Sequence, residues 1–257
     1  MKSNIEWNLW GKLDPLYGVA SWAGRGRDGA NPWTDEEFYA LGADWLDFEV
    51  AWRRTVGYTA GTVLEVGSGA GRMTRMLAQT FERVIATDVS NDMLLYAQAR
   101  IAAPNIVWQL SNGDSIPAEK DSIDAVFSSH VFQHFPDNAS QLAMFREIHR
   151  VLMPGGSFFV HLPIHAFPEV NRAYSDLARV CYRAYLGLSN VRASMRRIMI
   201  RLGIKKGYMH GVSYEMQVLL RDLAALEFTD LSVSAIGVRT GPGIHCCVAG
   251  RKLQLPG

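Results

Sequence analysis

The glycine-rich stretch at residues 64–73 constrains the fold more than any other feature of the chain. It reads LEVGSGAGRM and places Gly67, Gly69 and Gly71 at every second position, with Glu65 two residues before the first glycine. The apolar run TVLEV leads into it, and RMTRMLAQTF follows with helical spacing. A short β-branched run that ends in glycines before a helix is typical of a buried parallel strand. We therefore expect an α/β sheet.

The rest of the chain continues this alternation of strands and helices. Further strands are predicted at 83–89, 105–110, 123–129, 157–163, 231–238 and 244–252, and helices at 34–56, 72–81, 91–101, 140–152, 166–206 and 214–226. The tight connection RTGPG suits an antiparallel pair of final strands, and the alternation favours right-handed crossovers. The predicted fold class is α/β: a Rossmann-like, doubly wound, seven-stranded sheet whose last strand is antiparallel, with an N-terminal helical cap and a helical insertion after the fifth strand.

We expect a single domain, 1–257, that contains four segments. These are an aromatic-rich N-terminal cap (1–60), a cofactor-binding core (62–163), a helical insertion that caps the substrate (164–213), and a C-terminal helix with a strand pair (214–257). Six of the seven tryptophans lie in the first 52 residues. They are interpreted either as the core of a helical layer or as an aromatic lid over a ligand pocket, and the two interpretations are compatible.

Composition and charge exclude several classes of protein. The net charge of the whole chain is +1, whereas nucleic-acid binders carry a basic excess, so no nucleic acid partner is expected. The three cysteines form no disulfide framework, which favours a reducing compartment. We find no signal-peptide pattern and no run of roughly 18 apolar residues. These observations predict a cytoplasmic protein.

One segment departs strongly from the average charge. Residues 172–206 contain nine Arg or Lys and a single acid, so the rest of the chain is acidic. Three interpretations remain open: a solvated helix face, a basic rim that recruits an anionic acceptor, and peripheral contact with an anionic membrane through residues 189–206.

The spacing of the glycines limits what the turn at 67–71 can hold. A P-loop requires a lysine after its last glycine, and none follows here. A dinucleotide fingerprint requires a small residue at position 72, which is Arg72. The remaining pattern, E-x-G-x-G-x-G, suits a nucleoside with a zwitterionic tail and no pyrophosphate.

Five motifs in order resemble the class I S-adenosylmethionine-dependent methyltransferases of the small-molecule type. They are VLEVGSGAG, ATDVS, NGDSIP, IDAVFSSHVFQHF and RVLMPGGSFFVHLP, and they span about residues 62–163. The resemblance implies S-adenosyl-L-methionine as cofactor and S-adenosyl-L-homocysteine as product. It implies methyl transfer to an O or N atom of a small molecule such as a sugar, a glycolipid or a secondary metabolite.

The resemblance also implies a set of cofactor-binding residues. Asp88 would accept hydrogen bonds from both ribose hydroxyls, Met93 would lie near the adenine, and Asp114 would accept from the adenine amino group. The full set is Tyr17, Glu65, Gly67, Ser68, Gly69, Gly71, Asp88, Val89, Met93, Gly113, Asp114, Ser115, Ser129 and His130.

An acceptor hydroxyl must lose a proton, and a histidine is the natural base near pH 7. His134 is the first candidate and His130 the second, although His134 could instead order its loop. His161 and His165 are candidate substrate contacts. No spacing among histidines, cysteines and carboxylates indicates a metal site, so we expect a metal-independent enzyme. The alternatives are a binding protein with this fold and no turnover, and a methyltransferase that acts on an anionic lipid or macromolecule.

Overall fold

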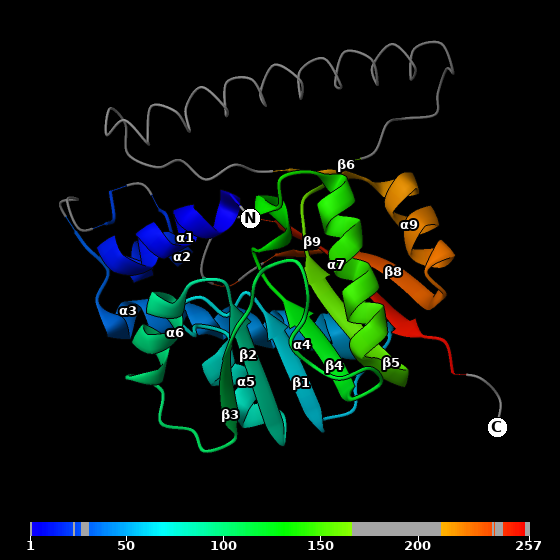
Figure 1. The fold of residues 1–257 in the computed structure, drawn as a ribbon, viewed down its shortest axis with the longest axis horizontal. Helices are drawn as coiled ribbons and strands as arrows, with labels where there is room; N and C mark the ends of the chain where they lie inside the picture. Colours follow the sequence, from blue (N-terminus) through cyan, green and yellow to red (C-terminus); the bar gives the residue numbers. More distant parts are fainter. Residues whose placement is uncertain are drawn as a thin grey trace, which may run out of the picture.

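The computed structural model describes residues 2–22, 24–26, 31–165, 212–237, 239 and 244–254. Its centre is a seven-stranded sheet of order β3-β2-β1-β4-β5-β9-β8 (Figure 1). The strands are β1 (Thr62–Val66), β2 (Arg83–Asp88), β3 (Ile106–Leu110), β4 (Ile123–Ser128), β5 (Leu152–His161), β8 (Phe228–Gly237) and β9 (Ile244–Lys252). Strands β1 to β5 pair in parallel, whereas β9 pairs antiparallel with both β5 and β8. The predicted fold class is confirmed.

The helices of the described ranges connect these strands and precede the first. They are α1 (Lys2–Leu13), α2 (Pro15–Val19), α3 (Asp35–Ala40), η1 (Leu41–Asp44), α4 (Trp45–Thr55), α5 (Thr74–Thr80), α6 (Asn91–Gln98), η2 (Phe132–His134), α7 (Asn138–Val151) and α9 (Met216–Ala225). A second, two-stranded sheet joins β6 (Ile164–His165) to β7 (Tyr214–Glu215). None of these helices combines the length and the apolar character that a membrane crossing requires.

The two faces of the large sheet are covered by different helices (Figure 1). Alternate residues of a strand point to opposite faces, so Leu64 packs with residues of α7 and α9, whereas its neighbour Val63 packs with residues of α4 and α5. A third cluster joins α2, α3 and α6. This third cluster places the N-terminal helices beside the glycine turn.

The tryptophans of the N-terminal region divide between core and surface. Trp45 and Trp52 are fully buried between α4 and the sheet, and the indole of Trp52 donates a hydrogen bond to Ser157 Oγ. Trp22, by contrast, is 42% exposed and packs edge-on against Trp33. The core interpretation therefore holds for the tryptophans of α4.

Several predicted boundaries are wrong; the strand expected at 231–238, for example, begins at Phe228. The single helix expected at 34–56 is divided by η1, where Gly42 approaches the Arg72 carbonyl so closely that a Cβ would lie 3.0 Å from its oxygen. The fifth strand begins at Leu152 and not at Ser157, so that Gly155 and Gly156 belong to it. A register shift between β4 and β5 accompanies this irregular start.

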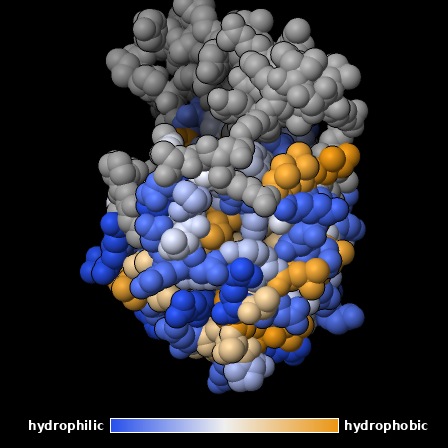
Figure 2. All heavy atoms as spheres, turned by 90° about the vertical axis from the view of Figure 1, so that its left-hand side faces the viewer, coloured by the Kyte–Doolittle hydropathy of each residue, from blue (hydrophilic) through white to orange (hydrophobic). Residues whose placement is uncertain are grey.

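The side of the molecule at α3, α6 and β3 is mainly hydrophilic, and its apolar side chains form separate patches (Figure 2). The expected helix at 166–206 and the basic segment 172–206 lie outside the described residues, as does all of the RTGPG connection except Arg239.

Candidate functional site

The glycine turn after β1 has a left-handed backbone at all three glycines. The φ angles of Gly67, Gly69 and Gly71 are 76°, 53° and 84°, a region that side chains disfavour. The backbone N–H groups of Gly67 and Ser68 both donate to the Thr87 carbonyl, at 2.8 and 2.9 Å. The turn is thereby attached to the end of β2.

Neighbouring elements approach the turn where a side chain would otherwise lie. A Cβ at Gly69 would lie 2.7 Å from Val19 of α2, and one at Gly67 would collide with Val131 after β4. The turn is therefore covered by the N-terminal helices on one side and by the loop after β4 on another.

Asp88 at the end of β2 is held by the same turn. One carboxylate oxygen accepts the Gly69 N–H at 2.8 Å, and the other accepts the Ser90 N–H at 2.8 Å. Burial raises the pKa of Asp88, and these backbone hydrogen bonds oppose the rise. Ser90 caps α6 by accepting the Met93 N–H. The carboxylate therefore has a fixed position at the edge of the sheet where strand order reverses.

Glu65 is buried beneath the turn. Thr74 Oγ1 donates to its carboxylate at 2.5 Å. Burial raises the pKa of Glu65 to about 7, and the nearby charge of Asp88 adds to this, while Thr74 and Arg72 act in the opposite direction. Arg72 is itself only 7% exposed, and the charges of Asp44 and Glu65 act on it. The ends of β1 and β2 thus hold a compact group of charges.

Three buried polar atoms near this turn have no hydrogen-bond partner among the described residues. They are Ser68 Oγ, Arg72 Nε and Ser129 Oγ. Two belong to the glycine turn and the third to the end of β4, which is the neighbour of β1 in the sheet. Since buried polar groups are almost always paired, these atoms indicate where a polar ligand binds. A nucleoside with a zwitterionic tail fits this position at the C-terminal ends of the strands.

The remaining predicted cofactor residues lie around the turn with different degrees of exposure. Tyr17 of α2 is half-buried, its ring 5.5 Å from that of Trp10. Met93 is 1% exposed and packs below Gly18, within the third cluster. Val89 follows Asp88 and is half-buried.

The loop after β3 contains the predicted adenine contacts. Gly113 has a φ of 81°. Asp114 and Ser115 are exposed, and their backbone N–H groups both donate to Asn112 Oδ1, at 2.8 and 2.9 Å. The side chain of Asn112 thus fixes the shape of this loop.

The candidate base His134 lies in η2 beneath the N-terminal helix α1. Its ring is 5.0 Å from that of Trp7, edge to face. The amide of Gln133 lies 3.0 Å from His134 Nε2 and, as a donor, requires a lone pair on that nitrogen. His165 lies farther along, in β6, with its Nδ1 3.0 Å from Ser213 Oγ.

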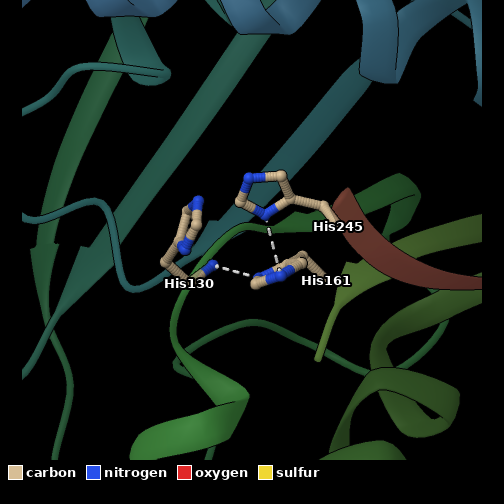
Figure 3. Close-up of side chains that lie close together, drawn as sticks. All are labelled: His130, His161 and His245. Carbon is tan, nitrogen blue, oxygen red and sulfur yellow. Dashed lines mark hydrogen bonds between the residues drawn. The ribbon is translucent and has the colours of Figure 1, made fainter. Parts of the chain in front are cut away.

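Three other histidines form a cluster that the sequence did not indicate (Figure 3). His130 follows β4, His161 ends β5 and His245 belongs to β9. His161 Nδ1 accepts the backbone N–H of His130 at 3.1 Å, and His161 Nε2 lies 3.0 Å from His245 Nδ1. The ring centroids are 4.3 to 4.6 Å apart. Burial lowers the pKa of each ring, that of His161 to about 3, so all three are neutral at pH 7.

Separation along the chain hides this cluster, because its members are 31 and 84 residues apart. The pairing of β5 with β4 and with β9 brings them together. The spacing along the sequence indicated no metal site, whereas in the described part of the chain ligand nitrogens of these three histidines lie within 4.8 Å of one another. Metal independence itself stays a prediction.

Comparison with known proteins shows which proteins the central part of this chain is similar to. A family model described as "Methyltransferase domain" matches residues 64–160. A ubiquinone/menaquinone biosynthesis C-methyltransferase from Desulfotalea psychrophila is 32% identical over 44% of this chain and 44% of its own length. A demethylmenaquinone methyltransferase from Tropheryma whipplei is 39% identical over 42% of this chain and 46% of its own length. The matched stretch thus spans less than half of these relatives.

Solved structures extend the likeness in fold to nearly the whole chain. The magnesium protoporphyrin IX methyltransferase of Synechocystis PCC 6803, determined with bound S-adenosylhomocysteine, superposes with a TM-score of 0.57 at 14% identity. The superposition covers 98% of this chain and 100% of that one. Residues 64–160 therefore match a methyltransferase domain, and the fold of the chain is that of solved S-adenosylmethionine-dependent methyltransferases.

Proposed function

We propose that this protein transfers a methyl group from S-adenosyl-L-methionine to an O or N atom of a small molecule. The observation that carries the proposal is the carboxylate of Asp88, held by the N–H groups of Gly69 and Ser90 beside the unpartnered atoms of Ser68 and Ser129. A fixed carboxylate at this edge of the sheet suits two neighbouring hydroxyls of a ribose and repels a phosphate. The relatives named for quinone biosynthesis support a small-molecule acceptor.

The residues of the turn would bind and orient the cofactor. When bound, the cofactor supplies a sulfonium methyl that is already a strong electrophile. Asp88 would accept hydrogen bonds from the ribose, and the hydroxyls of Ser68 and Ser129 would contact its polar tail. Arg72 provides a buried cation next to the turn, suited to the carboxylate of that tail. In-line positioning of the methyl group supplies much of the acceleration.

On the acceptor side, His134 remains the preferred base. Burial holds the pKa of His130 well below 6.5, which makes that ring a weak proton acceptor at pH 7. His134 can accept a proton on Nε2 once the Gln133 amide releases that nitrogen. Trp7 of α1 packs edge-on against the same half-buried ring. An acceptor that uses this base would therefore bind near η2, beside α1.

The wider setting forms part of the same proposal. The described cysteines, Cys246 and Cys247, are both free thiols, which supports a reducing, cytoplasmic location. A sugar, a glycolipid or a secondary metabolite stays the expected acceptor. The basic segment 172–206 and the membrane contact through 189–206 lie outside the described residues and stay predictions.

Calorimetric titration with S-adenosylhomocysteine and with NAD tests the cofactor assignment. We expect S-adenosylhomocysteine to bind and Asp88→Asn to weaken it, whereas Asp92→Asn, which removes a charge from the first turn of α6, serves as the control. Tight binding of NAD without binding of S-adenosylhomocysteine would overturn the proposal. Cofactor binding without methyl transfer to any acceptor in a panel would support the alternative of a binding protein with this fold.

A further inference from the structure

The cluster of His130, His161 and His245 is built from three separate parts of the sheet (Figure 3). We propose that these three side chains bind one divalent transition-metal ion of the zinc type. Ligand nitrogens from all three lie within 4.8 Å of one another. Imidazole nitrogens are common ligands of such ions, and three protein ligands are the usual number for a site that keeps one position open.

The spacing of the nitrogens suits such an ion. Two nitrogens bound to zinc at about 2.0–2.1 Å in tetrahedral geometry are roughly 3.3 Å apart. His161 Nε2 and His245 Nδ1 are already 3.0 Å apart. An increase of a few tenths of an ångström would therefore be enough for an ion to bind between these two rings.

The backbone holds the three rings before any ion binds. His161 lies in the ladder of β5 and β9, directly opposite Cys247, and His245 lies two residues before that cysteine. His130 has a φ of 62°, a backbone conformation that is unfavourable for residues other than glycine. Such strain tends to occur where the surroundings fix a functional geometry. Preorganised ligands lose little freedom on binding, which favours affinity.

The present hydrogen bonds predict which proton an ion displaces. His161 Nδ1 accepts the N–H of His130, so the neutral ring carries its proton on Nε2 and donates it to His245 Nδ1. The ion takes the place of this shared proton. A neutral ring that binds an ion through Nε2 carries its proton on Nδ1, so the proton moves to Nδ1 and the bond from the His130 N–H is broken.

One nearby charge opposes a cation, and two others offset it. Arg72 acts electrostatically on all three rings. The negative charges of Asp44, which is 3% exposed, and of Glu65 both raise the pKa of Arg72 and so offset part of its positive charge. The carboxylates therefore reduce the repulsion between this guanidinium and an ion at the cluster.

The cluster lies beside the proposed ligand site, because His130 directly follows Ser129, whose buried hydroxyl has no partner among the described residues. A metal ion lowers the pKa of a bound hydroxyl and orients it. If an acceptor oxygen binds at the open position of this ion, the ion would take over the role proposed for His134. This role rests on the proposed function, whereas the metal site itself does not.

Titration of the untagged full chain with Co²⁺ and Zn²⁺, after chelator treatment, tests the site. We expect one ion to bind per chain. Bound Co²⁺ should absorb in the visible range, as it does in a site of low symmetry, and this absorption should disappear when Zn²⁺ displaces it. His245→Gln and His161→Gln should weaken binding by more than the roughly 10–100-fold that loss of an outer-sphere partner costs. His149→Gln on α7, outside the cluster, is the matched control.

Absence of a one-to-one complex in the wild-type chain, or equal affinity in all three variants, would overturn the site. The affinity for S-adenosylhomocysteine, measured without metal, reports separately on the proposed function. If that ligand binds and the ions do not, the metal site fails alone. Circular dichroism of each variant separates loss of a ligand from loss of the fold.

Discussion

The indole of Trp7 lies edge-on to the imidazole of His134, with ring centroids 5.0 Å apart and planes at 67°. The first residue belongs to the N-terminal helix and the second to the loop after β4, so their contact joins the cap to the methyltransferase core. Trp45 and Trp52 have a core role, whereas the interpretation of the N-terminal tryptophans as a lid over a ligand pocket stays a prediction.

Replacement of His134 by glutamine should reduce turnover far more than binding. Loss of a general base costs about 10² to 10⁴ in rate, while the cofactor residues of the glycine turn stay intact. The measurement is release of S-adenosylhomocysteine with an acceptor found by screening, alongside calorimetry for the cofactor. Trp7→Leu, which removes the ring contact and keeps the base, should mainly raise KM for the acceptor. Full turnover in His134→Gln would show that this histidine only orders its loop.

Gly71→Ala should destabilise the protein because the new Cβ would lie 2.5 Å from Ile101 Cδ1 and 3.0 Å from Ala97 Cβ. Gly24→Ala is a matched control, since Gly24 has a similar φ of 80° but nothing within 4 Å of an added Cβ. Both changes carry the left-handed penalty of roughly 1–2 kcal/mol. Only Gly71→Ala adds overpacking, typically about 1–3 kcal/mol. Urea unfolding measures the difference, and equal losses of stability would contradict the packing argument.

Glu65 should make stability depend on pH. Its pKa in the folded protein is raised to about 7 from 4.5, mainly by burial. The folded state therefore favours the protonated form, so the contribution of Glu65 is fully present below about pH 4.5 and is lost as the pH rises to about 7. The shift corresponds to about 3 kcal/mol at 1.36 kcal/mol per pKa unit.

Comparison of the wild-type chain with Glu65→Gln isolates this effect, because other groups titrate equally in both. The free energy of unfolding of the wild-type chain should fall relative to that of the variant between pH 4.5 and 7. The charges of Asp88 and Arg72 act on Glu65 in opposite directions, so they change the midpoint and not the sign. Parallel stability curves for the two proteins would contradict the assignment.

Local patterns in the sequence were sufficient for the sheet and for the glycine turn. The runs TVLEV and IHCCVAGRK form β1 and β9 with the predicted bounds, and Ser90 caps α6. These features depend on neighbours in the sequence: burial of short apolar runs, left-handed glycines and a hydroxyl before a helix. Such features can be predicted from the sequence without knowing which elements pack against them.

Features that depend on contacts between distant segments were not predictable. The break at Leu41–Asp44 follows from the approach of Gly42 to the Arg72 carbonyl, 30 positions away in the sequence. The histidine cluster requires the register of β5 against β9, which places His161 opposite Cys247. A single sequence shows the residues of such a contact but not their proximity.

The two structural classes of tryptophan should respond differently to replacement by alanine. Trp52 is 0% exposed, lies parallel to Phe127 and Phe159, and donates to Ser157 Oγ. Trp52→Ala should therefore cost about 3–5 kcal/mol, as for other buried aromatic side chains. Trp22 is 42% exposed, and its aromatic partner among the described residues is Trp33.

Trp22→Ala should cost only the roughly 0.5–1.5 kcal/mol of an aromatic pair, together with a small loss of buried area. Thermal unfolding of the two variants at one protein concentration measures the contrast, and calorimetry with S-adenosylhomocysteine shows whether either change reaches the cofactor site. Trp52 packs on the α4 face of the sheet, within a cluster that contains no residue of the turn at 67–71. Its loss should therefore lower stability while the cofactor affinity of the folded fraction is preserved. Similar losses of stability for the two variants would contradict this division between core and surface.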